Sequence, residues 1–72
     1  MTIGDAIAHQ CHARGIALSE LARRIGISRQ ALHNRLGRET ISYASLKIFA
    51  DALGCNVSDF FLILEESGHD AP

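Results

Sequence analysis

Two short amphipathic segments meet in the stretch LSELARRIGISRQALHNRLG, residues 18–37, and this stretch decides the fold. The segments join at Gly26, where a glycine takes the positive φ that ends a helix at little cost. Ala22 is small where two helices would have to cross closely. The apolar residues that would set the angle between the helices are Leu21, Ile25, Ile27 and Leu32. The pattern therefore predicts two consecutive helices that pack across a tight turn.

The second segment carries its polar residues on one helical face: Ser28, Arg29, Gln30, His33 and Asn34. Two helices in this arrangement are typical of a helix-turn-helix, in which the second helix enters the major groove of duplex DNA. A polar face can also be a plain solvated surface, which most helices have. The motif favours DNA recognition over that alternative.

Length and composition limit the remaining possibilities. The 72 residues make one domain, and a hydrophobic content of 47 % is that of a globular protein and not of a disordered one. No apolar run approaches the ~20 residues that span a bilayer, and the N-terminus lacks the features of a secretory signal. Cys11 and Cys55 lie far apart in the chain, which favours reduced thiols and a cytoplasmic location over a disulfide.

Charge is unevenly distributed along the chain, although its net value is only −1. Residues 14–38 hold six arginines and one glutamate, a net charge of +5, whereas residues 39–72 hold six acidic residues and one lysine, a net charge of −5. A basic field over the suspected recognition segment supports nucleic acid as the partner. Ordinary uneven surface charge would give the same numbers, so this observation is supporting only.

Five helices are expected from their start and stop signals. Thr2, Ser28, Ser42 and Asn56 are N-cap residues ahead of apolar residues at helical spacing, and glycines follow three of the helices. The expected helices run from Thr2 to Gly15, from Leu18 to Gly26, from Ser28 to about Gly37, from Ser42 to Gly54 and from Asn56 to Glu66. Helices this short are stable only when packed together, so we predict an all-α, compact five-helix bundle over residues 1–66. Residues 67–72 lack an apolar pattern and are expected to form a flexible tail.

This order of parts is similar to that of a known family. The segments GIALSELARRIGISRQALHNRL (15–36) and SLKIFADALGCNVSDFF (45–61) resemble the lambda-repressor-like helix-turn-helix family, also called the Cro/C1 or XRE type. The resemblance runs from about residue 3 to residue 63, and ELA (20–22), GIS (26–28) and ADALGC (50–55) are its most specific pieces. It implies a five-helix DNA-binding domain, mostly found in dimeric transcriptional repressors, with the helix that follows Ser28 as the recognition helix.

Two departures from the family pattern bear on this interpretation. The family usually has Thr and then Gln at the start of the second helix, where this chain has Ala17 and Leu18. An alanine there cannot cap the helix, a loss of about 1 kcal/mol. Late in the third helix the usual apolar position falls on Arg35, with Leu36 one residue later, so the end of that helix could pack in another register.

Specific contacts follow from the motif and the resemblance. The base-reading residues are expected to be Arg29, Gln30, His33 and Asn34, because arginine pairs with guanine and amides pair with adenine in the major groove. The phosphate contacts are expected at Ser28, Arg38, Thr40, Ser42, Tyr43 and Lys47, in a segment that flanks the DNA backbone in the family. Any one of these phosphate contacts could instead be a merely solvated side chain.

Other site chemistry is expected to be absent. His9, Cys11 and His12 could suggest a metal site, but Cys11 should point into the core and a metal needs three or four ligands. No arrangement typical of a catalytic triad, a carboxylate pair or a phosphate-binding glycine loop stands out. We therefore expect no metal, no cofactor and no enzymatic activity.

The run VSDFFLILEE, residues 57–66, is richer in bulky apolar residues than one buried face requires. Phe61, Leu62 and Ile63 are expected to form a homodimer interface, although a satisfied core helix is the alternative. The sequence thus predicts a sequence-specific transcriptional regulator, in the family mostly a repressor, that binds a palindromic operator in double-stranded DNA as a dimer. The alternative function is a protein-interaction module, antitoxin-like or an adaptor, that uses the helix-turn-helix surface; a sensor built on His9, Cys11 and His12 is weaker.

Overall fold

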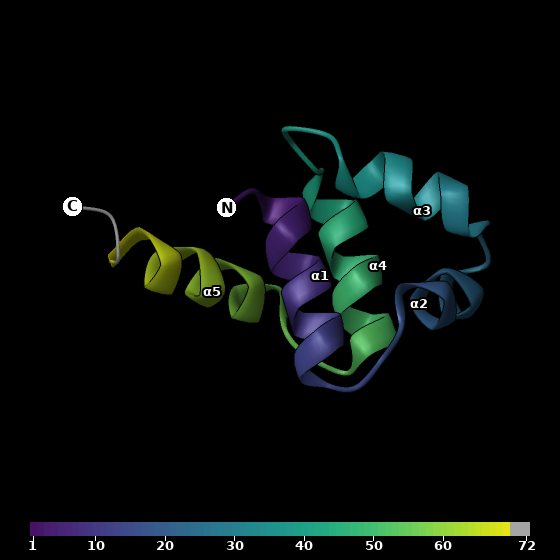
Figure 1. Ribbon diagram of the computed structural model, residues 1–72, viewed down its shortest axis with the longest axis horizontal. Helices are drawn as coiled ribbons and strands as arrows, with labels where there is room; N and C mark the ends of the chain where they lie inside the picture. The colour runs from purple at the N-terminus through teal and green to yellow at the C-terminus, as the bar shows by residue number, and fades with distance from the viewer. Residues whose placement is uncertain (70–72) are drawn as a thin grey trace.

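The computed structural model describes residues 1–69, with side chains described as far as Glu66. The chain forms α1 (Ile3–Ala13), α2 (Leu18–Ile25), α3 (Arg29–Leu36), α4 (Tyr43–Leu53) and α5 (Val57–His69), with no strand over residues 1–69 (Figure 1). The predicted all-α bundle of five helices is confirmed.

Short-range caps set the ends of these helices. Thr2 and Asp5 form a reciprocal capping box at the start of α1, with backbone-to-side-chain distances of 3.0 and 3.1 Å. Ser28 and Ser42 accept hydrogen bonds from the first turns of α3 and α4. At the start of α5, Asp59 accepts from the backbone N–H of Asn56 at 2.9 Å. These N-terminal boundaries lie where the sequence predicted them.

The core takes one large residue from every helix. Ile7, Leu21, Leu32, Phe49 and Phe60 come from α1 to α5 in that order, and each is at most 1 % exposed. Each helix therefore contributes a buried apolar residue to one common core, and each packs against at least two other helices. Cys11 is buried among these residues, as its place in the apolar pattern predicted.

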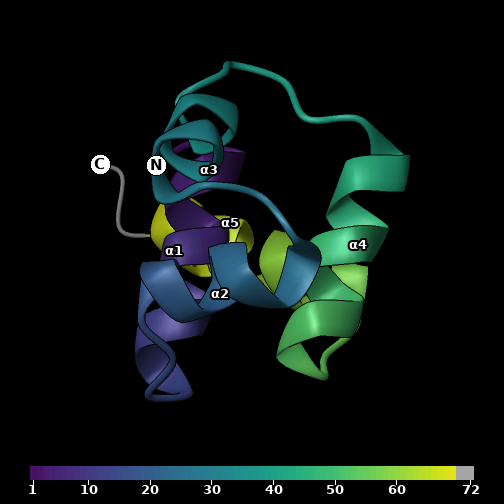
Figure 2. The same cartoon turned by 90° about the vertical axis from the view of Figure 1, so that its right-hand side faces the viewer.

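The helices are arranged so that α3 stands at one end of the molecule. It packs against α1 and α2, while α2 also packs against α4 and α1 against α5. In Figure 1, α2 and α3 lie on the right and α5 projects to the left, and Figure 2 looks directly at the α2–α3 end. The two helices of the motif therefore face away from the chain's C-terminal helix.

Helix α5 is longer than the sequence suggested. Its backbone is helical as far as His69, so residues 67–69 of the expected flexible tail continue the helix. Apolar periodicity could not detect this last turn, because Ser67, Gly68 and His69 are not apolar residues. Residues 70–72 of that tail lie outside the described residues.

None of the helices described over residues 1–69 is both long enough and apolar enough to cross a membrane.

Candidate nucleic-acid interface

The outward face of α3 carries the four side chains predicted to read bases. Arg29, Gln30, His33 and Asn34 are all exposed, whereas Leu32 on the opposite side is 1 % exposed. Ser28 caps the start of the helix, because its hydroxyl oxygen accepts a hydrogen bond from the Ala31 N–H at 3.0 Å. The structure therefore brings the four predicted residues together on one accessible helix face.

Two of these side chains are already bonded to each other. The amide Nε2 of Gln30 donates to Oδ1 of Asn34 at 3.1 Å, one helical turn away. The bond leaves a second Nε2 proton and the Oε1 atom of Gln30 available. This donor and this acceptor can pair with N7 and the N6 amino group of adenine in the major groove. Gln30 is thereby held in place before any partner arrives.

The arginines of α2 are committed to internal contacts, unlike those of α3. Glu20 accepts from Arg23 at 2.7 and 2.9 Å and from Arg24 at 3.2 Å. These bonds, Arg23's first, lower the pKa of Glu20 to about 2, so it is ionised at neutral pH. Arg24 also donates to the carbonyl of Ala52 at 3.0 Å and so ties α2 to the end of α4.

Positive charge is consequently concentrated on α3 and the loop after it. Over the residues with described side chains, no ion pair engages Arg29, Arg35 or Arg38. Of the six arginines in residues 14–38, the three around α3 and Arg14 at the end of α1 have no acidic partner among the described side chains, whereas Glu20 offsets one of the two charges on α2.

The residues predicted to contact phosphate flank α3 on both sides. Ser28 stands at its start, and the loop from Gly37 to Ser42 with the first turns of α4 holds the others. All of them are exposed: Ser28, Arg38, Thr40, Ser42, Tyr43 and Lys47. Lys47 forms an ion pair with Asp51 at 3.2 Å, so its charge is partly offset, whereas Tyr43 is 70 % exposed. Of the two cations in this set, Arg38 is therefore the one without an acidic partner among the described side chains.

The start of α2 shows the predicted departure from the family pattern. Ala17 is its N-cap residue and makes no side-chain capping bond. Leu18 is half-buried against the core and, with His33, lines a small hollow between α1, α2 and α3. This end of α2 therefore packs inward and presents no amide at the surface.

Gly4 is a residue that the sequence analysis missed. It is buried in the first turn of α1, where an added Cβ would overlap the backbone carbonyl of Leu36, the last residue of α3. The close approach of the two backbones fixes the position of α3 relative to α1. A glycine inside the first turn of a helix, where no positive φ is required, was the available signal.

Arg35 and Leu36, the last two residues of α3, have different environments. Leu36 packs against the core while Arg35 stays half-exposed. The apolar contact of the last turn thus falls one residue later than in the family pattern, at the place where α3 meets Gly4.

Residues that suggested other chemistry are kept apart. His9 and His12 are exposed on α1 while Cys11 points into the core. The residues with described placement contain no group of three or more His, Cys, Asp or Glu side chains that could hold a metal ion. Cys11 and Cys55 are free thiols.

One family model matches this chain: the Cro/C1-type HTH DNA-binding domain, over residues 6–65. The matched segment contains α2 and α3 and most of the core. No curated protein and no solved structure matches the chain.

Proposed function

The chain belongs to the family of Cro/C1-type helix-turn-helix DNA-binding domains, and we propose that it is a cytoplasmic transcriptional repressor that binds a palindromic operator as a homodimer. In this proposal α3 lies in the major groove of each half-site. Arg29, Gln30, His33 and Asn34 meet the base edges, and Ser28 with the loop and α4 residues named above meets the backbone.

One observation carries the proposal: the exposed face of α3 offers a guanidinium and two amides, and none of its charge is neutralised internally. A merely solvated helix face commonly pairs its charges along the helix, as Glu20, Arg23 and Arg24 do on α2. Around α3 the cations are left available for an anionic partner.

The dimer is supported by α5. Phe61 and Leu62 are 46 % and 52 % exposed on a helix that projects away from the α2–α3 end (Figure 1). Apolar side chains on a projecting helix favour association with a second copy. In such a dimer the two copies of α3 would have to reach half-sites that lie ~34 Å apart, one turn of DNA.

Selection of bound sequences from a random pool of duplex DNA tests the proposal. We expect a palindromic motif with half-sites about 10 base pairs apart, centre to centre. A motif without symmetry would contradict the dimeric operator. Absence of any enriched motif would contradict sequence-specific binding and favour the protein-interaction function. That alternative is supported by the start of α2, where Leu18 packs inward and no amide is available for DNA.

Removing a base-reading side chain should weaken binding selectively. We expect Arg29→Ala or Gln30→Ala to cost about 1–3 kcal/mol on the selected site, because each side chain supplies a bidentate contact to one base. Non-specific binding should change far less. Fluorescence anisotropy on the selected site and on a scrambled duplex measures both affinities, and equal losses on the two duplexes would contradict base reading.

A backbone contact should behave differently. Arg38→Ala is expected to weaken binding to all sequences alike and to reduce the slope of log K against log salt by about 0.9, the contribution of one phosphate contact. Affinities measured at several salt concentrations give this slope. Arg23→Ala is the matched control, since Glu20 already holds that guanidinium at 2.7 Å and its loss should leave the slope nearly unchanged. An unchanged slope for Arg38→Ala would remove Arg38 from the backbone contacts.

A further inference from the structure

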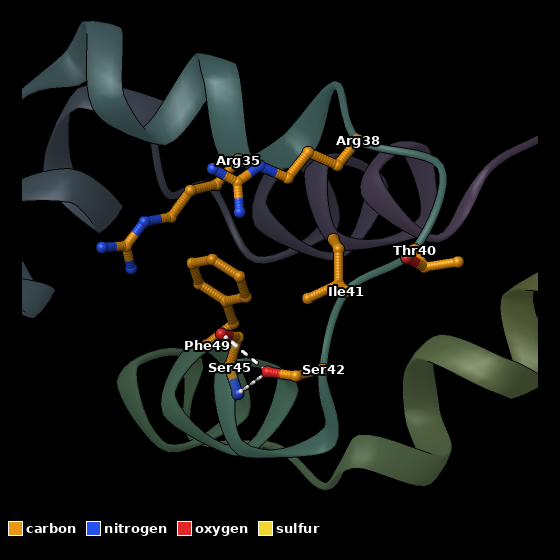
Figure 3. A pocket seen from close by; sticks show the side chains of 7 residues that line it. All are labelled: Arg35, Arg38, Thr40, Ile41, Ser42, Ser45 and Phe49. Atoms are coloured by element: carbon orange, nitrogen blue, oxygen red, sulfur yellow. Dashed lines mark hydrogen bonds between the residues drawn. The ribbon is translucent and has the colours of Figure 1, made fainter.

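A pocket of about 320 Å³ separates the end of α3 from the start of α4. Its lining residues are Arg35, Arg38, Thr40, Ile41, Ser42, Ser45 and Phe49 (Figure 3). Helix α3 packs against α1 and α2 but, over the described residues, does not pack directly against α4, which leaves this space between them. The volume lies at the lower end of the range for sites that bind small molecules.

One wall of the pocket is positively charged. Arg35 and Arg38 both extend along its α3 side, as Figure 3 shows. No carboxylate of the described side chains pairs with either guanidinium, whereas Arg23, Arg24 and Lys47 all have acidic partners. A guanidinium presents parallel N–H donors that match the two oxygens of a carboxylate. The wall is therefore suited to an anion.

The facing wall adds hydroxyl groups. The Ser42 hydroxyl donates to the Ser45 hydroxyl oxygen at 3.1 Å and also accepts from the Ser45 N–H at 3.2 Å. The Ser45 hydroxyl proton remains available as a donor toward the pocket. A donor here would lie across from the guanidinium groups and add to the preference for a negatively charged guest.

The floor of the pocket is apolar. The ring of Phe49 points from α4 toward the two arginines, and Ile41 closes one side (Figure 3). Phe49 is fully buried and belongs to the core, so the apolar surface that a guest could contact comes from the half-buried Ile41 above it. This floor distinguishes the pocket from the backbone contacts proposed above, because a DNA phosphate group carries no apolar part to fill it.

We propose that this pocket is a binding site for a small organic anion, a carboxylate carried on a compact apolar body. The carboxylate would bind Arg35 and Arg38, and the apolar body would lie over Ile41, above the buried ring of Phe49. Arg38, Thr40 and Ser42 also belong to the proposed backbone contacts, so the pocket is tested on the free protein, where DNA does not compete for them.

Sodium benzoate is a suitable probe, since it combines a carboxylate with a flat apolar ring. Titration of the ¹⁵N-labelled chain, followed by NMR, should give saturable shifts at the backbone amides of Arg38, Ser42 and Ser45. The double variant Arg35→Gln/Arg38→Gln should weaken binding about ten-fold or more, because charged hydrogen bonds are lost. Arg14→Gln, which removes an exposed arginine at the end of α1, is the matched control and should bind benzoate like the unmodified chain.

A second variant keeps both arginines. Ser45→Glu places a carboxylate at the pocket and should exclude benzoate by like charge, with a spectrum that otherwise remains that of the folded chain. Benzamide, which lacks the charge, and inorganic phosphate, which lacks the ring, should each bind at least several-fold more weakly than benzoate. Three results would overturn the proposal: non-saturable shifts, equal binding by benzamide or phosphate, or undiminished benzoate binding by both variants.

Discussion

Replacing Gly4 by alanine should lower the free energy of unfolding by about 1–3 kcal/mol, although alanine is the better helix former. The added Cβ would overlap the backbone carbonyl of Leu36, and a backbone atom cannot rotate away as a side chain can. Helices α1 and α3 would have to separate, which weakens the packing of Leu32 and Leu36 in the core. Urea unfolding followed by circular dichroism measures the loss.

Gly37 provides the matched control. It caps α3 with φ −80°, a conformation open to any residue, and an added Cβ would lie 3.5 Å from the nearest carbonyl oxygen, an ordinary contact. Gly37→Ala should therefore be neutral or stabilise by up to about 1 kcal/mol. If Gly4→Ala were as stable as the unmodified chain, the close approach of α1 and α3 would not constrain the fold.

The second large effect is expected from Leu62→Glu. If α5 pairs two copies, a charge at its 52 % exposed Leu62 should yield a folded monomer, because the side chain makes little contact with its own core. A palindromic site would then be bound by one domain at a time, which should reduce affinity by about 10²-fold or more. Sedimentation velocity at micromolar concentration and anisotropy on the selected site measure the two effects.

The control for this substitution is Ile48→Glu, which makes the same kind of change at a 50 % exposed apolar residue on α4. It should leave the sedimentation coefficient unchanged. If the unmodified chain sediments as a monomer when free and binds its operator as a single copy, the dimer is ruled out, whatever the effect of Leu62→Glu.

Local rules were enough to predict most of the fold. The N-caps at Thr2, Ser28 and Ser42 bond to residues within four positions along the chain, and the left-handed glycines 26 and 54 end their helices equally locally. Short sequence patterns therefore predict both kinds of helix end. The exposed face of α3 follows from helical periodicity in the same way. Apolar spacing could not reveal the last turn of α5, since Ser67 and Gly68 carry no apolar signal.

Contacts between distant parts of the chain could not be predicted from the sequence. The contact between Gly4 and Leu36 and the bond from Arg24 to Ala52 connect residues on separate helices, and no periodicity encodes either. The Glu20–Arg24 pair does have a signal, since residues four apart on a helix are neighbours. A sum of charges along the sequence counts Glu20 but does not show which arginines it engages, so it cannot separate the paired cations of α2 from the unpaired ones around α3.

The packing of α1 on α5 governs how this chain can be taken apart. Phe60 and Ile7 lie in the same core, although one belongs to the last helix and the other to the first. A fragment that ended at Gly54 would lose Phe60 and uncover the part of α1 that α5 covers, so we expect the two motif helices not to fold as a free-standing unit. During synthesis the same contact delays completion of the core until the final helix has emerged from the ribosome, and a premature stop before Val57 should leave a product for proteases.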